Sequence, residues 1–112
     1  MNAIAIETPI ETAAAPVFHL KKLEKAAYLL KNIAHPLRLG VIQLLSHHEK
    51  LSVGDICQRL DAEQSLMSHH LSNMRMVGLL TSTREGKNVF YALKERDVLE
   101  ILLCIENCNC NY

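Results

Sequence analysis

The stretch LSVGDICQRLDAEQSLMSHHLSNMRMVGLLTSTREGKNVFY, residues Leu51–Tyr91, decides the fold of this chain. It contains two short segments with helical spacing of apolar residues, separated by the break DAEQ, and then two strand-like segments joined by EGKN. Two short helices with so brief a link cross steeply, as they do in a helix-turn-helix. A hairpin that follows them directly is the layout of a winged helix-turn-helix. This order predicts a protein that handles duplex DNA.

The two helices have recognisable ends. The first is predicted from about Val53 to Leu60, with Ser52 as its N-cap and Asp55 in an arrangement similar to a capping box. Ser65 is the expected cap of the second helix, which we expect to stop at Gly78. Helical spacing predicts the buried side of the first helix as Val53, Ile56, Cys57 and Leu60, and that of the second as Leu66, His70, Leu71, Met74 and Val77.

The hairpin is predicted from two runs rich in Thr, Val, Phe and Tyr, Leu79–Arg84 and Asn88–Leu93. The EGKN segment between them supplies the glycine that a tight turn needs. Upstream, His19–Ile33 has helical periodicity and ends near His35, because Pro36 disfavours a helical residue before it. Pro36 then starts the next helix, in which Leu37, Val41, Leu44 and Leu45 are expected to face inward.

A last helix is predicted from Glu95 to about Cys108. It carries more apolar surface than one small monomer can cover, so we expect a homodimer in which this helix is buried. The predicted fold class is therefore mainly α with a β-hairpin wing, in the order α-α-α-α-β-β-α. Residues 1–17 are expected to form a flexible N-terminal tail, and residues 18–112 a single winged helix-turn-helix domain.

Composition narrows the class of protein less than the motifs do. Apolar residues make up 49% of the 112 residues, and twelve basic side chains balance twelve acidic ones. The net charge of zero gives no support for binding to nucleic acid, and the basic excess is local and mild. The N-terminal residues do not resemble a secretory signal, and no run approaches the ~18 apolar residues of a membrane span. We therefore expect a cytoplasmic protein.

The second helix of the motif carries the side chains expected to read DNA. Short polar or amide-bearing groups near the start of a recognition helix reach base edges in the major groove. Such side chains occur at Gln64, Ser65, Ser68, His69 and Ser72. Arg84 and Lys87 are expected near a flanking phosphate or the minor groove, and Arg75 could bond a phosphate or an acidic neighbour. A polar helix face can also be merely solvated, and basic residues on a hairpin can serve as edge charges.

Four segments together resemble the ArsR/SmtB family of small winged-helix repressors. They are HPLRL, LSVGDI, the pattern SxMSHHLxxMRxxGLL and REGKNVFYAL, and the resemblance covers about residues 20–110. The resemblance implies a dimer formed through the first and last helices, which binds an imperfect inverted repeat in an operator. It also implies that an inducer releases the DNA.

The same resemblance bears on the inducer. Metal-sensing members carry thiolates in the segment that reads KLSVGDIC here, so Ser52 and Gly54 stand in the main ligand positions and Cys57 remains as a small buried hydrophobe. The zinc site of the last helix would fall on Glu95, Asp97, Cys108 and Asn111, a poor ligand set. Another subgroup carries a pair of cysteines at the positions that are Gln43 and Cys110 here. Because Gln43 has no thiol, that pair cannot form.

Three cysteines near the C-terminus remain as candidate sensors: Cys104, Cys108 and Cys110. Thiolates suit a thiophilic metal such as Zn, Cu(I) or As(III), and exposed thiols are also oxidation sites. Three functions stay open from the sequence. The chain is a repressor released by thiol chemistry, a constitutive repressor without an inducer or cofactor, or an interaction or metal-buffer module that does not bind DNA. No constellation of nucleophile and base indicates an enzyme.

Overall fold

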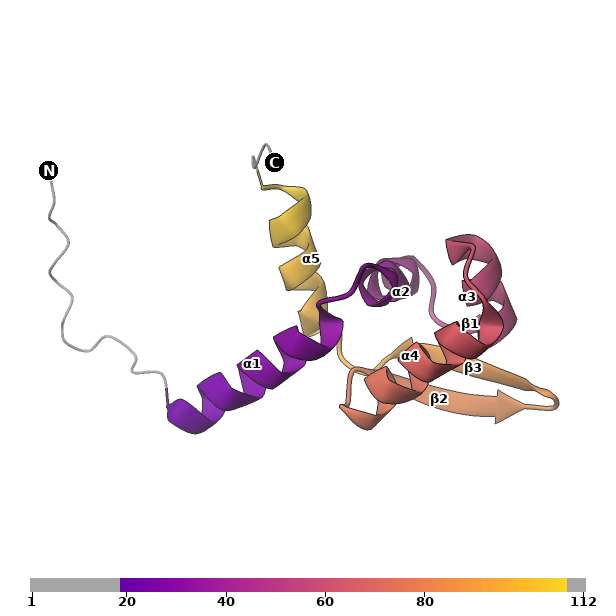
Figure 1. Ribbon diagram of the computed structural model, residues 1–112, viewed down its shortest axis with the longest axis horizontal. Helices are drawn as coiled ribbons and strands as arrows, with labels where there is room; N and C mark the ends of the chain where they lie inside the picture. Colours follow the sequence, from indigo (N-terminus) through magenta and orange to yellow (C-terminus); the bar gives the residue numbers. More distant parts are fainter. Residues whose placement is uncertain (1–18, 109–112) are drawn as a thin grey trace, which may run out of the picture.

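The computed structural model describes residues 19–108, apart from the side chains of Asp97 and Ile105. Helices α2, α3 and α4 and the hairpin form the body, whereas α1 extends away from it and α5 stands beside α2 (Figure 1). The elements are α1 (Leu20–Ile33), α2 (Pro36–His47), β1 (Leu51–Ser52), α3 (Val53–Leu60), α4 (Gln64–Met76), β2 (Leu80–Glu85), β3 (Asn88–Leu93), the 3₁₀ turn η1 (Arg96–Val98) and α5 (Leu99–Glu106).

The hairpin belongs to a three-stranded antiparallel sheet of order β1-β3-β2. Tyr91 on β3 is opposite Leu51 on β1 and Ser82 on β2, so β3 is the central strand. Gly86 has a φ of +65° in the turn between β2 and β3, a conformation that glycine adopts without strain. The predicted hairpin is confirmed, but the strand β1 was missed, because two residues carry too little pattern to identify a strand.

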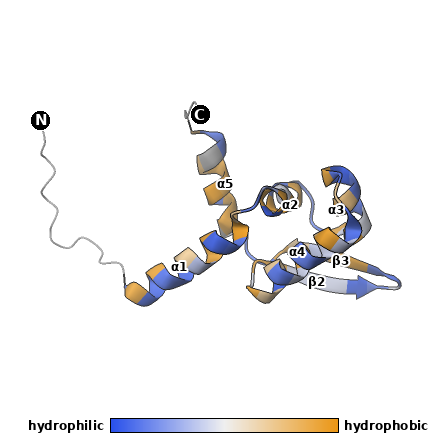
Figure 2. Ribbon diagram, in the orientation of Figure 1, coloured by the Kyte–Doolittle hydropathy of each residue, from blue (hydrophilic) through white to orange (hydrophobic). Residues whose placement is uncertain are grey.

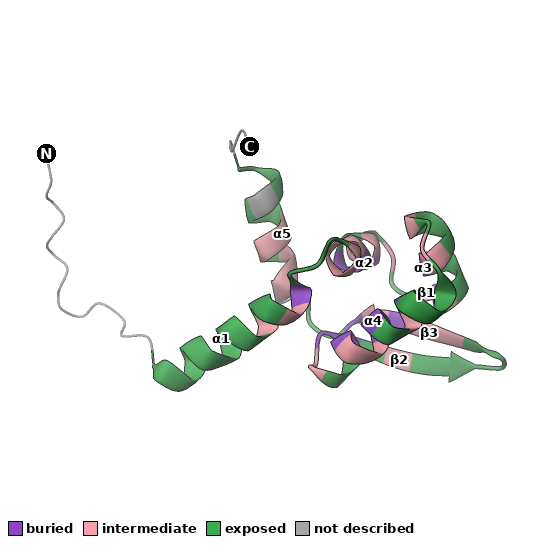
Figure 3. Ribbon diagram, viewed as in Figure 1, coloured by how far each residue is buried: buried purple, intermediate pink, exposed green. Residues whose placement is uncertain are grey.

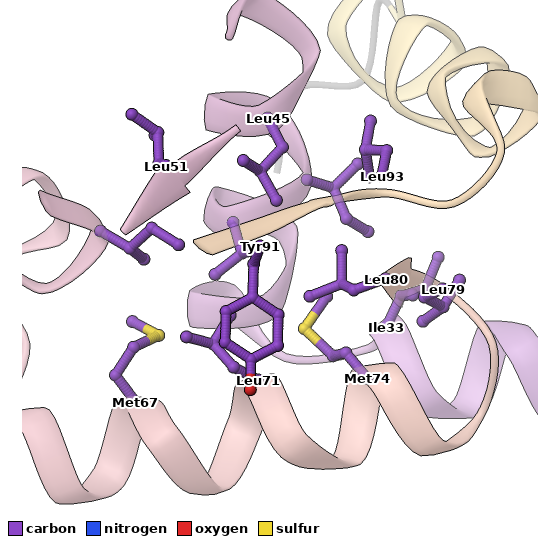
Figure 4. Packing of buried hydrophobic residues seen from close by; sticks show 13 residues of the cluster. Ile33, Leu45, Leu51, Met67, Leu71, Met74, Leu79, Leu80, Tyr91 and Leu93 are labelled. Atoms are coloured by element: carbon purple, nitrogen blue, oxygen red, sulfur yellow. The ribbon is translucent and has the colours of Figure 1, made fainter. Parts of the chain in front are cut away.

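The hydrophobic core lies between α4, α2 and the sheet (Figure 4). Met67, Leu71 and Met74 of α4 are fully buried and pack with Tyr91 and Leu80 of the sheet. Full burial of one such side chain contributes roughly 1.5–3 kcal/mol to stability, so this face of α4 is fixed firmly to the body. The opposite face of α4 is thereby directed away from the core.

Helix ends follow local chemistry, with one correction. Ser52 caps α3 as predicted, because its hydroxyl accepts a hydrogen bond from the Asp55 N–H at 3.1 Å. The cap of α4 is Glu63 and not Ser65, and the helix starts at Gln64. The residue of the first turn of α4 that faces the core was also predicted incorrectly. Leu66 was expected to be buried but is 46% exposed, and Met67 is fully buried instead.

Helices α1 and α5 leave apolar surface uncovered (Figures 2 and 3). On α1, Leu20 is 70% exposed, and Leu23, Tyr28 and Leu30 are also exposed, while Leu103 on α5 is 54% exposed. The last helix is shorter than predicted, because η1 occupies the first residues of the expected span. No helix within residues 19–108 has the length and hydropathy that a bilayer span requires.

Candidate nucleic-acid interface

The five side chains predicted to read bases all come from α4, on the side away from the core. Gln64, Ser65 and His69 are exposed, and Ser68 and Ser72 are half-buried. Because residues three and four positions apart share a helix face, Ser65, His69 and Ser72 form one outward stripe, with Ser68 beside it. The structure thus brings the predicted residues together on one polar face of the second helix of the motif.

Glu63 orders the first turn of this face. Its carboxylate accepts a hydrogen bond from the Ser65 hydroxyl and another from the Leu66 N–H at 3.2 Å. These two hydrogen bonds lower the pKa of the Glu63 carboxyl, so the carboxylate that caps α4 is charged at neutral pH. Glu63 thereby holds the Ser65 hydroxyl at the start of the polar face.

A second contact positions His69. Nε2 of His69 lies 3.2 Å from Nδ2 of Asn73, one helical turn further along α4. Restricting the His69 ring before a partner binds lowers the entropy lost on binding. Asn73 was not among the predicted residues. Its spacing of four from His69 was the signal that could have identified it.

The predicted basic residues lie outside α4 or at its end. Arg84 and Lys87 are exposed on the hairpin, at the end of β2 and in the turn, and Arg75 is exposed in the last turn of α4. The ion pair between Lys50 and Glu85 is the one such pair among the described side chains. Arg84 and Lys87 therefore carry positive charge that no carboxylate of the described chain neutralises through an ion pair.

A buried polar network lies behind the polar face of α4. His70 is 6% exposed, and its Nδ1 accepts a hydrogen bond from Nε of Arg38 at 2.9 Å. Nη1 of Arg38 also donates to the carbonyl oxygen of Asn32 at 2.9 Å, and the His35 ring lies 4.4 Å from the His70 ring. Burial, and then the charge of Arg38 and the neighbouring His35 and His69, lower the pKa of His70. His70 is thus a neutral histidine that joins α4 to α2 through Arg38, and Arg38 in turn bonds the end of α1.

The cysteines do not assemble a metal site in the described part of the chain. Cys57 and Cys104 carry free thiols, with Cys104 exposed on α5, whereas Cys108 is disulfide-bonded. Burial raises the pKa of the half-buried Cys57 thiol, as expected for a thiol that acts as a small hydrophobe. Cys110 lies outside the described residues. Among the side chains that the structure describes, no group of three His, Cys, Asp or Glu could hold a metal ion.

Comparison with known proteins identifies the family. Residues 33–83 match the family described as the helix-turn-helix domain. The chain is 36% identical over 90 residues to the transcriptional activator HlyU of Vibrio cholerae, spanning 80% of this chain and 82% of HlyU. This chain belongs to the ArsR/SmtB family. It is also 43% identical over 65 residues to the arsenical resistance operon repressor of Escherichia coli, covering 58% of this chain and 56% of that repressor.

The solved structures agree with this assignment. The transcriptional repressor PagR of Bacillus anthracis has a TM-score of 0.69 against this chain at 36% identity, over 78% of this chain and 99% of PagR. The predicted winged helix-turn-helix fold is therefore confirmed. This member of the ArsR/SmtB family is a DNA-binding transcriptional regulator, which also confirms the predicted function class.

Proposed function

We propose that this ArsR/SmtB regulator represses transcription as a homodimer in the cytoplasm and has no enzymatic activity. Each subunit places α4 in the major groove of one half of an inverted-repeat operator. Gln64, Ser65, Ser68, His69 and Ser72 contact the bases, and Arg75, Arg84 and Lys87 contact phosphates. The observation that carries the proposal is the polar face of α4, which is fixed from behind by a fully buried apolar face and capped by Glu63.

The proposed dimer rests on the apolar surface of α1 and α5. A monomer would leave Leu20, Leu23, Leu30 and Leu103 about half or more exposed to water. Burial of such side chains against a second copy contributes roughly 25 cal/mol for each Å² of apolar surface removed from water. Two-fold symmetry of the protein then matches two-fold symmetry of the operator, which is the reason for an inverted repeat.

A mobility shift with the promoter region of its own operon tests this function. The proposal predicts a complex that survives an excess of unrelated duplex, and His69→Ala is expected to lose most of this preference. His47→Ala is the matched control, because His47 is an exposed histidine at the end of α2, outside the polar face of α4. A protein that binds the promoter and the unrelated duplex equally well would contradict the proposal.

Release of DNA by an inducer stays a prediction. The exposed Cys104 thiol is accessible to a thiophilic metal or an oxidant, and a disulfide-bonded Cys108 would become a thiolate ligand after reduction. Zn, Cu(I) and As(III) are the metals that suit such ligands. Arsenical sensing by that relative does not by itself extend to this chain, because Ser52 and Gly54 offer no thiolate at the start of α3.

A further inference from the structure

Leu66 is an apolar side chain among the otherwise polar exposed residues of the first turn of α4. It is 46% exposed, whereas the other apolar residues of the first two turns, Met67 and Leu71, are fully buried. Its neighbours along the helix, Gln64 and Ser65, are exposed and polar. The core therefore does not account for the exposed half of the Leu66 side chain.

The position of Leu66 relates it to the base-reading residues. His69 and Asn73 follow Leu66 by three and seven positions, so the three residues form one ridge along the helix. This ridge lies beside the stripe that contains Ser65 and Ser72. His69 and Asn73 are already joined by their 3.2 Å contact. The Leu66 N–H is bonded to Glu63, which fixes the backbone of this turn. Leu66 is thus held at the start of the ridge, where a recognition helix comes closest to base edges.

We propose that Leu66 is a specificity-determining residue that recognises the 5-methyl group of a thymine in each operator half-site. This inference rests on the proposed function, because it requires α4 to enter the major groove. A leucine side chain can neither donate nor accept a hydrogen bond, so it cannot read the polar edge of a base. The methyl group of thymine is the apolar feature that base pairs present in the major groove.

The expected effect follows from the size of the contact. Burying one methyl group contributes ~0.8 kcal/mol, which corresponds to about fourfold in affinity at 1.4 kcal/mol for each factor of ten. Replacing that thymine by deoxyuridine removes the methyl group and leaves every hydrogen-bonding group of the base in place. The substitution should therefore weaken binding about fourfold in each half-site and leave the phosphate contacts unchanged.

The experiment starts from duplexes that the wild-type protein selects from a random pool. Each thymine of a selected duplex is replaced singly by deoxyuridine, and affinity is measured for wild type, Leu66→Ala and Leu66→Met. The proposal predicts one position in each half-site where wild type and Leu66→Met lose about fourfold and Leu66→Ala loses nothing. His47→Ala is the control, since His47 is exposed at the end of α2, outside α4, and this variant should behave as wild type.

The outcomes separate this inference from the proposed function. If no sequence is enriched from the pool, the proposed function itself fails. Selected duplexes without a thymine in each half-site would overturn the role of Leu66. The same conclusion follows if wild type tolerates deoxyuridine at every position, or if Leu66→Ala keeps the full discrimination. Circular dichroism and thermal unfolding establish that both Leu66 variants are folded.

Discussion

The pair formed by Arg38 and His70 is expected to be a coupled element of stability, and a double-mutant cycle measures the coupling. Arg38→Met removes the donor to Nδ1 of His70, which then stays buried without a partner. His70→Leu removes the ring, including an Nε2 atom that is buried without a hydrogen-bond partner among the described residues. The double variant removes both sides of the contact at once.

The magnitudes follow from burial. A buried polar atom that loses its partner costs about 1–3 kcal/mol, so Arg38→Met should lower the free energy of unfolding by that amount. His70→Leu should cost less, because the half-buried Arg38 keeps its bond to Asn32 and the unpaired Nε2 disappears. The double variant should be more stable than the sum of the single effects predicts, by about 1–2 kcal/mol. For a chain of this size, 1 kcal/mol shifts the melting temperature by roughly 4 °C.

The pH dependence gives an independent signature of His70. Its pKa is lowered in the folded protein, so below a pH of about 6.5 the unfolded chain binds a proton that the folded chain does not. Stability is then lost as the pH falls from about 6.5 toward the folded pKa, with a slope of at most ~1.4 kcal/mol per pH unit. In His70→Leu this part of the slope should be absent.

Urea unfolding at fixed protein concentration, from pH 5 to 8, is the assay, because the stability of a dimer depends on concentration. Arg59→Met is the matched control, since it removes an exposed contact of 3.4 Å between Arg59 and His48 and should cost little. Additive effects of Arg38→Met and His70→Leu, or an unchanged pH slope in His70→Leu, would refute the reasoning.

Three further changes test the DNA contacts, the dimer and the sensor. Arg84→Gln with Lys87→Gln removes four proposed phosphate contacts from a dimer, so the slope of log affinity against log salt should fall by about 3.6, at ~0.9 for each contact. Titrations at several salt concentrations measure this slope, and an unchanged slope would exclude the wing from the interface. Leu23→Asp should convert the dimer to folded monomers with weaker operator binding, seen by sedimentation equilibrium, whereas a persistent dimer would place the interface elsewhere. Cys104→Ser with Cys108→Ser should keep operator binding in mobility shifts and abolish release by metals and oxidants, and a full response would show that these thiols are not the sensor.

Much of the DNA-binding unit was predictable because its signals are local. The bounds of α3, the Ser52 cap and the strand β3 depend on residues within a few positions of each other, and the sequence predicted each of them. The start of α4 was predicted incorrectly for a local reason as well. Both Ser65 and Glu63 can accept a hydrogen bond from a helical N–H, and side-chain geometry decides between them.

The rest could not be predicted because it depends on contacts between distant residues. Strand β1 exists because Leu51 and Ser52 pair with β3, nearly forty positions away. The incorrect choice of Leu66 was avoidable, because Met67 precedes His70, Leu71 and Met74 by three, four and seven positions, the spacing of one helix face. His70 was predicted to be buried, but its bond to Arg38 joins residues that are 32 positions apart. No pattern in either segment indicates that contact.

The position of Arg38 connects the two halves of the proposed mechanism. One nitrogen of its guanidinium donates to the last turn of α1, at Asn32, and another donates to the recognition helix, at His70. Because guanidinium is planar, the directions of these two hydrogen bonds are fixed relative to each other. The face of α4 that is proposed to read bases is therefore linked through Arg38 to the helix that is proposed to form the dimer. If α1 packs against a second copy as proposed, Arg38 gives that contact a hydrogen-bonded connection to α4 that involves none of the residues proposed to contact DNA.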